Sequence, residues 1–127
     1  MHKIILQEYY GGKIFNNYFS VVLPYDNINH REESTVEVYY KYILLGVAEI
    51  KAVRKIFAGD IRDVLSFLDC GKPAYRMAAE IYKHAGKQDP ALPLDHLVLQ
   101  YKERNMPNQE EYLQDWWKGI QLLNPQS

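Results

Sequence analysis

The stretch that decides the fold runs from Leu45 to Ala85 and reads LGVAEIKAVRKIFAGDIRDVLSFLDCGKPAYRMAAEIYKHA. Polar and apolar residues alternate from Val47 to Ile56, which predicts a long strand. A helix should follow and end at Gly71, because glycine is the residue most often found just after a helix. Pro73 suits the first turn of a second helix, which should end near Gly86. We therefore expect a long strand that leads into a helical hairpin.

The spacing also predicts which side chains point together. Alternate residues of a strand share a face, so Ile50 and Arg54 should lie on the same side of the sheet. We expect Leu45 and Gly46 to bend the chain before this strand begins. The buried stripe of the first helix should consist of Ile61, Val64, Leu65 and Leu68.

Four further β segments surround this stretch, at residues 3–8, 17–23, 35–43 and 94–101. Together with the long strand they predict an α+β fold in one domain, residues 1–127. Its small, mostly antiparallel sheet should curl or close into a barrel that carries the helical hairpin as an insert. A last helix is expected from about residue 108 to 122. Its apolar face includes Tyr112, Trp116 and Trp117 and should pack on the domain or lie at an interface.

Several classes of protein and site are unexpected here. The apolar runs are far shorter than the roughly 20 residues of a membrane-spanning helix, so we expect no membrane contact. Only three aliphatic residues follow Lys3, too few for the core of a signal peptide, so we expect a cytoplasmic protein. Cys70 is the only cysteine, which excludes an internal disulfide. No two histidines have the i, i+4 spacing of a helical zinc site, so we expect neither a metal nor a cofactor.

The charge is unevenly distributed although the net charge is only −1. Residues 51–87 hold eight Lys and Arg against four Asp and Glu, whereas both flanking parts are acidic. This pattern is compatible with an ordinary solvated surface, or with a basic patch that binds phosphate groups. The candidate contacts to a nucleic acid are Lys13, Lys51, Arg54, Lys55, Lys72, Arg76 and Lys83, with Tyr39 as a platform for base stacking.

A resemblance to a known family rests on three segments. The Gly12-Lys13 turn follows a first strand, and the segment Leu45 to Ile50 follows the strand Val36 to Tyr39. The segment Phe67 to Lys72 then leads into a helix. This order resembles the PUA-like superfamily, ASCH-type domains in particular, over about residues 3 to 101. The resemblance implies a curled sheet with a helical hairpin.

The ASCH domains proposed to be enzymes carry a Glu and a basic residue soon after the turn lysine. In this chain Lys13 is followed by Ile14 to Phe19, which contains no acidic residue. We therefore expect a module that binds RNA, another single-stranded nucleic acid or a nucleotide-like anion without catalysing a reaction.

Two alternatives to this binding role remain open. The first is an interaction protein that forms a homodimer through the helix bearing Tyr112, Trp116 and Trp117. The second is a small hydrolase acting on RNA or a nucleoside. It would use Lys13 with Glu37 or Glu49 as the base, which requires the lysine and a carboxylate to converge in a pocket.

Overall fold

The strands and helices follow one another in the order that the hydrophobic pattern predicts. The computed structural model describes residues 1–7 and 10–105 of the 127-residue chain. Its strands are β1 (His2–Leu6), β2 (Tyr18–Pro24), β3 (Thr35–Tyr40), β4 (Ile43–Phe57) and β5 (Pro93–Arg104). Its helices are α1 (Asp63–Cys70) and α2 (Ala74–Ala85), with short 3-10 segments η1 (Tyr10–Phe15) and η2 (Ala58–Asp60).

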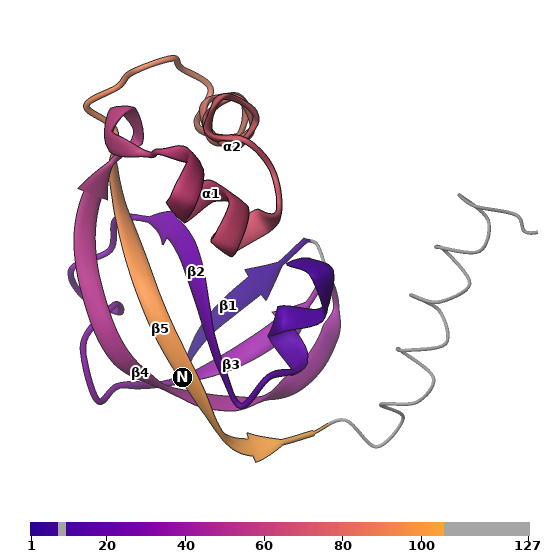
Figure 1. Cartoon of the computed structure of the whole chain (residues 1–127). Helices are drawn as coiled ribbons and strands as arrows, with labels where there is room; N and C mark the ends of the chain where they lie inside the picture. Colours follow the sequence, from indigo (N-terminus) through magenta and orange to yellow (C-terminus); the bar gives the residue numbers. More distant parts are fainter. Residues whose placement is uncertain (8–9, 106–127) are drawn as a thin grey trace, which may run out of the picture.

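The five strands form one curled, mixed sheet in the order β1-β3-β4-β5-β2. The pair β1 and β3 is parallel, and the other three pairs are antiparallel. The predicted α+β class and the mostly antiparallel sheet are therefore confirmed. The sheet curls into a half-barrel, and α1 and α2 lie together at one end of it (Figure 1). The two edge strands of the sheet, β1 and β2, lie on either side of the opening of this half-barrel.

Two hydrophobic clusters hold these layers together. The larger one fills one face of the sheet and includes the fully buried Ile4, Val36, Ile50 and Leu97. The smaller one lies between the sheet and the helices, where Met77 of α2 packs in the same cluster as Leu94 of β5 and Ala58 and Ile61 from the segment before α1. The helices therefore cover only part of the sheet face that lies opposite the larger cluster. The rest of that face can carry polar side chains.

The expected bend at Leu45 and Gly46 is wrong. Strand β4 runs without interruption from Ile43 to Phe57, and the chain turns earlier, at Lys41, which has a φ of 53°. Gly46 serves a different purpose, because β5 passes directly over it. A Cβ at this position would collide with the backbone carbonyl of Glu103 and would also touch the ring of Tyr101.

The predicted facing of Arg54 is also wrong. A β-bulge lies between Ile50 and Ala52, where the register against β5 shifts by one residue. Because side chains alternate along a strand, one extra residue reverses every side chain that follows it. Ile50 consequently packs in the core, whereas Arg54 pairs with His96 on the face that carries the helices.

The stripe expected for the first helix is only half correct, because Ile61 is buried and Leu65 packs in the smaller cluster, whereas Val64 and Leu68 do not. Gly71 ends α1 in the left-handed conformation, with a φ of 73°, and Gly86 ends α2, as predicted. The buried residues of α1, however, are Ser66 and Asp69, while Val64 and Leu68 are 74% and 78% exposed. The polar contacts of the buried Ser66 and Asp69 therefore orient this short helix more strongly than the spacing of its apolar residues does.

Two further expectations concern the last helix and the membrane. The predicted helix at 108–122, with Tyr112, Trp116 and Trp117, lies outside the described residues. Within residues 1–7 and 10–105, no helix is long and apolar enough to cross a membrane.

The close approach at Gly46 leads to a stability prediction. Gly46→Ala should lower the free energy of unfolding by about 3 kcal/mol, because β4 and β5 must separate to admit the methyl group. Gly71→Ala is the matched control: the space that its methyl group would fill is open to 4 Å, so only left-handed strain of roughly 1 kcal/mol is expected. Urea unfolding followed by circular dichroism measures both, and equal losses would contradict the proposed clash.

Candidate functional site

The 3-10 segment η1 is fixed against the end of the sheet by two long-range bonds. The buried Tyr101 hydroxyl donates to the carbonyl of Ile14 at 2.7 Å, and Arg104 donates to the carbonyl of Phe15 at 2.8 Å. Burial raises the pKa of Tyr101, so its hydroxyl keeps the proton that it donates. These bonds hold the adjacent Lys13 in place beside β2 and α1.

Asp69, near the end of α1, is the polar centre of this region. Its side chain is 5% exposed, and Lys13 Nζ lies 2.9 Å from its Oδ1. Ser20 of β2 donates a second hydrogen bond to the same oxygen at 3.2 Å. The carboxylate thus joins η1, β2 and α1, and neither of these bonds uses its other oxygen, Oδ2.

A row of cross-strand neighbours crosses the sheet next to the contact between Lys13 and Asp69. Val22 of β2, His96 of β5 and Arg54 of β4 are direct partners in the ladder and therefore share a face. An Arg54 guanidinium nitrogen lies 3.3 Å from Nδ1 of His96. Partial burial lowers the pKa of His96, the positive charges of Arg54 and Lys13 lower it further, and Asp69 opposes this effect.

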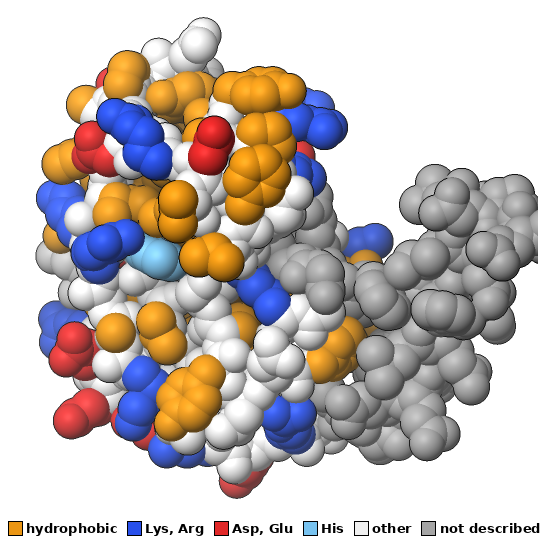
Figure 2. Space-filling view, viewed as in Figure 1, with side chains coloured by type: hydrophobic (Ala, Val, Ile, Leu, Met, Phe, Trp, Pro, Cys, Tyr) orange, Lys and Arg blue, Asp and Glu red, His pale blue; other side chains and the backbone are white. Residues whose placement is uncertain are grey.

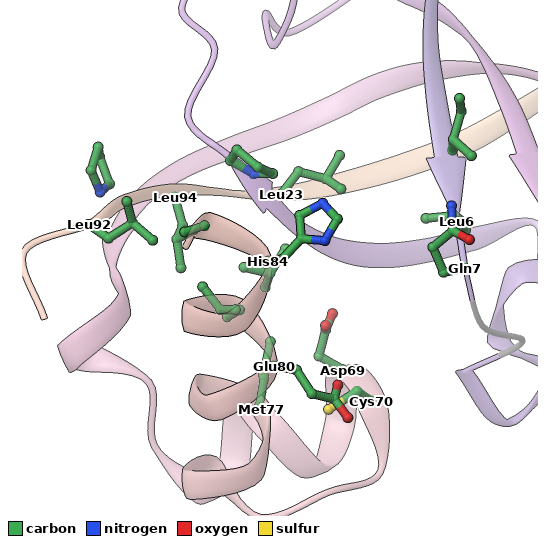
Figure 3. A pocket seen from close by; sticks show the side chains of 16 residues that line it. Leu6, Gln7, Leu23, Asp69, Cys70, Met77, Glu80, His84, Leu92 and Leu94 are labelled. Carbon is green, nitrogen blue, oxygen red and sulfur yellow. The ribbon is translucent and has the colours of Figure 1, made fainter. Parts of the chain in front are cut away.

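A cavity of about 380 Å³ opens beside Asp69, between the edge strands and the helices. We call it the Asp69 cleft. Most of its wall is apolar, from residues that include Leu6, Leu23 and Leu94 (Figure 3). Polar groups border it at a few points: Figure 3 shows Asp69 and Cys70 from α1, Glu80 and His84 from α2, and Gln7 next to the end of β1.

The basic residues predicted to bind a nucleic acid do not gather in one place. Figure 2 shows Lys and Arg side chains spread over the visible face, with hydrophobic side chains between them. Several of these cations have close partners in the described part of the chain. Lys13 contacts Asp69, Lys51 lies 3.4 Å from Glu49, and Lys72 lies 2.5 Å from Glu80.

The remaining predicted residues lie on different elements, with Lys55 on β4, Tyr39 on β3, and Arg76 and Lys83 on α2. The Lys55 ammonium lies 4.6 Å from the ring centre of Tyr25, and Lys3 lies 5.5 Å from that of Tyr39 on β3. Arg76 and Lys83 are exposed on α2. Of the predicted set, Lys13 and Arg54 are the two that the structure brings together around Asp69 and His96.

Lys13 does contact a carboxylate, but that carboxylate belongs to neither of the two acids expected from the sequence. Glu49, one of the two expected partners, contacts Lys51 and Lys102 on the sheet. The observed partner of Lys13 is Asp69. A sequence signal existed, because Ser66 and Asp69 are three residues apart and so share one face of a short helix.

Comparisons with known proteins add no family to this description. No protein-family model matches the chain, and no curated protein or solved structure matches it.

The buried ion pair should be visible in stability measurements. Lys13→Met should cost roughly 3 kcal/mol of unfolding free energy, because it leaves the Asp69 carboxylate buried without a cation. Adding Asp69→Asn to this variant should recover part of the loss, since the uncompensated charge is removed. A Lys13→Met variant as stable as the parent in urea unfolding would contradict the role assigned to the pair.

The charges around His96 can be tested by an NMR titration of its imidazole. The pKa of His96 should lie below its ordinary value of 6.5. Asp69→Asn should lower it further, and Arg54→Gln should raise it. Lys102→Gln, which removes a cation that pairs with Glu49, should leave it unchanged.

The same shift predicts a direction for stability. The folded chain favours neutral His96, so this residue should reduce stability as the pH falls below about 6.5, and His96→Gln should remove that contribution. A pKa of His96 at or above 6.5 would contradict the arrangement of charges described here.

Proposed function

We propose that this protein binds a nucleotide, either free or as an unstacked base of a single-stranded nucleic acid, in the Asp69 cleft. The observation that carries this proposal is the buried carboxylate of Asp69, which is paired with Lys13 and borders a largely apolar cavity. The proposal keeps the class of ligand expected from the sequence. It moves the binding site from the outer face of the helical hairpin to the space between the hairpin and the sheet.

The size and lining of the cavity support a small ring-containing ligand. Ligand pockets are mostly apolar, enclose roughly 300 to 1,000 Å³ and carry a few polar groups that fix the orientation of the ligand. The Asp69 cleft, at about 380 Å³, lies at the lower end of that range. A nucleobase has two flat apolar faces and a polar edge, which suits walls formed by Leu6, Leu23 and Leu94.

Asp69 supplies the group that would read the edge of the base. Its Oδ1 accepts bonds from Lys13 and Ser20, which hold the carboxylate in a fixed orientation. A carboxylate can only accept hydrogen bonds, so it selects edges that present amino or imino hydrogens, as in cytosine or guanine.

The cations near the cleft would meet the phosphate. Val22 lines the cavity, and Arg54 lies two strands away from it in the same row. Since neighbouring strands are about 4.8 Å apart, the backbone of Arg54 lies roughly 10 Å from that of Val22. The ribose of a bound nucleotide and the long Arg54 side chain would together bridge this separation.

We further propose that the curled sheet and helical pair constitute a PUA-like fold of the ASCH type. The mixed half-barrel and the placement of α1 and α2 between β4 and β5 support this assignment. So does the position of Lys13 directly after Gly12, in η1, where it contacts Asp69 of the cleft.

Calorimetric titration tests the binding role. Ribonucleoside monophosphates and short single-stranded RNA should bind at about 50 mM salt and more weakly as the salt concentration rises. Asp69→Asn should weaken binding at least tenfold, because the amide presents a donor where the base needs an acceptor. Asp60→Asn, the same exchange at an exposed position, should leave affinity unchanged.

Arg54→Gln should weaken binding and reduce its salt dependence. The proposal fails if no nucleotide or oligonucleotide binds at low salt, or if Asp69→Asn and Asp60→Asn have equal affinity.

A second candidate function follows from the same contact. A lysine and a carboxylate 2.9 Å apart beside a cavity form a proton donor and acceptor of the kind that a hydrolase of RNA or a nucleoside needs. Incubation of the protein with nucleosides and oligonucleotides, followed by chromatography, separates the two roles. Turnover that is abolished by Lys13→Met would favour the hydrolase, and unchanged ligand would favour simple binding.

A further inference from the structure

The loop between β2 and β3 is more ordered in its bonding than its polar sequence suggests. Asp26 Oδ1 accepts hydrogen bonds from the backbone amides of Ile28 and Asn29, both at 3.0 Å. The amide of His30 in turn donates to the carbonyl of Asp26 at 3.0 Å. This single turn brings the side chains of Asp26 and His30, four residues apart, to the same side of the loop.

His2, at the start of β1, lies against this turn. Its ring centroid is 5.6 Å from that of His30, with the two rings nearly perpendicular. One nitrogen of His2, one carboxylate oxygen of Asp26 and one nitrogen of His30 all lie within 4.8 Å of one another. Ligands of a tetrahedral metal ion are roughly 3.4 Å apart, so small side-chain rotations would complete the geometry.

A buried carboxylate orients His30 toward this space. Asp95 Oδ2 lies 2.7 Å from His30 Nδ1, and both side chains are less than 5% exposed. The same oxygen accepts the backbone amide of Asp26 at 2.9 Å. Because a carboxylate accepts hydrogen bonds, this contact selects the neutral tautomer of His30 with the proton on Nδ1, in which Nε2 is the nitrogen that can bind a metal. Histidines that bind metals usually have such a carboxylate partner.

We propose that His2, Asp26 and His30 form a binding site for a divalent transition-metal ion such as Zn²⁺, with Asp95 as the residue that positions His30. Two imidazoles and one carboxylate are donors typical of zinc and of the neighbouring first-row metals. The Asn29 side chain donates to Asp26 Oδ2 at 2.8 Å, which holds this carboxylate in a fixed orientation.

The site would keep one coordination position open. His2, Asp26 and His30 line a hollow of about 400 Å³, and zinc sites with three protein ligands bind water or substrate at the fourth position. This hollow shares Ile5, Leu23 and Pro24 with the Asp69 cleft, so the two spaces adjoin between the edge strands. The metal site does not depend on the proposed nucleotide binding, and either could fail alone.

Calorimetry with Zn²⁺ on the untagged, chelator-treated full chain tests the proposal. One equivalent should bind, and His2→Gln, Asp26→Asn and His30→Gln should each weaken binding at least tenfold. Asp95→Asn should weaken it about 10- to 100-fold while leaving the three ligands in place. His84→Gln and Cys70→Ser, which alter potential zinc ligands outside the site, should bind like the parent chain.

Two readouts keep the test decisive if a buried variant folds poorly. His2 is partly exposed at the start of the first strand, so His2→Gln should fold even if His30→Gln does not. Zn²⁺ should also raise the melting temperature of the parent chain and not that of His2→Gln. The proposal is overturned if the parent chain fails to bind Zn²⁺ at micromolar concentrations, or if His2→Gln and Asp26→Asn bind it as tightly as the parent.

Discussion

The contact between Lys13 and Asp69 joins η1 to α1 across 56 residues of sequence, and Ser20 of β2 binds the same carboxylate oxygen. It favours the orientation of α1 that turns Asp69 toward the sheet, although Val64, Phe67 and Leu68 are then exposed. A buried charge is costly unless it is paired, so each partner fixes the position of the other. The orientation of the helix, the border of the cleft and the position of Lys13 all follow from this pair.

The electrostatics of the site are local. The excess of positive charge in the middle of the chain is real, yet Lys51 and Lys72 each lie close to an acid. Such contacts weaken the long-range field that a block of free cations would produce. The groups that remain relevant to a ligand are those whose pKa is shifted by their surroundings. His96, whose pKa is influenced by Arg54 and Asp69, is the clearest example.

The order of the strands and the C-terminal ends of both helices could be predicted from the sequence, since alternation and the glycines at 71 and 86 are local signals, but the uninterrupted course of β4 through Gly46 could not. The facing of Arg54 could not, because the bulge after Ile50 arises from pairing with β5 and leaves no mark in the alternation. The burial of Asp69 depends on η1, more than 50 residues earlier in the chain. The cluster of His2, Asp26 and His30 similarly depends on contacts between β1 and a loop.

The two proposed sites occupy neighbouring hollows between the edge strands, where the curled sheet stays open. The central claim is that ligands enter this opening and do not bind the outer helical face. Chemical-shift mapping of the ¹⁵N-labelled chain with ribonucleoside monophosphates tests it most directly. The largest shifts should fall on Gln7, Val22, Asp69 and His96; shifts confined to Arg76, Lys83 and their neighbours, or no shifts, would contradict it.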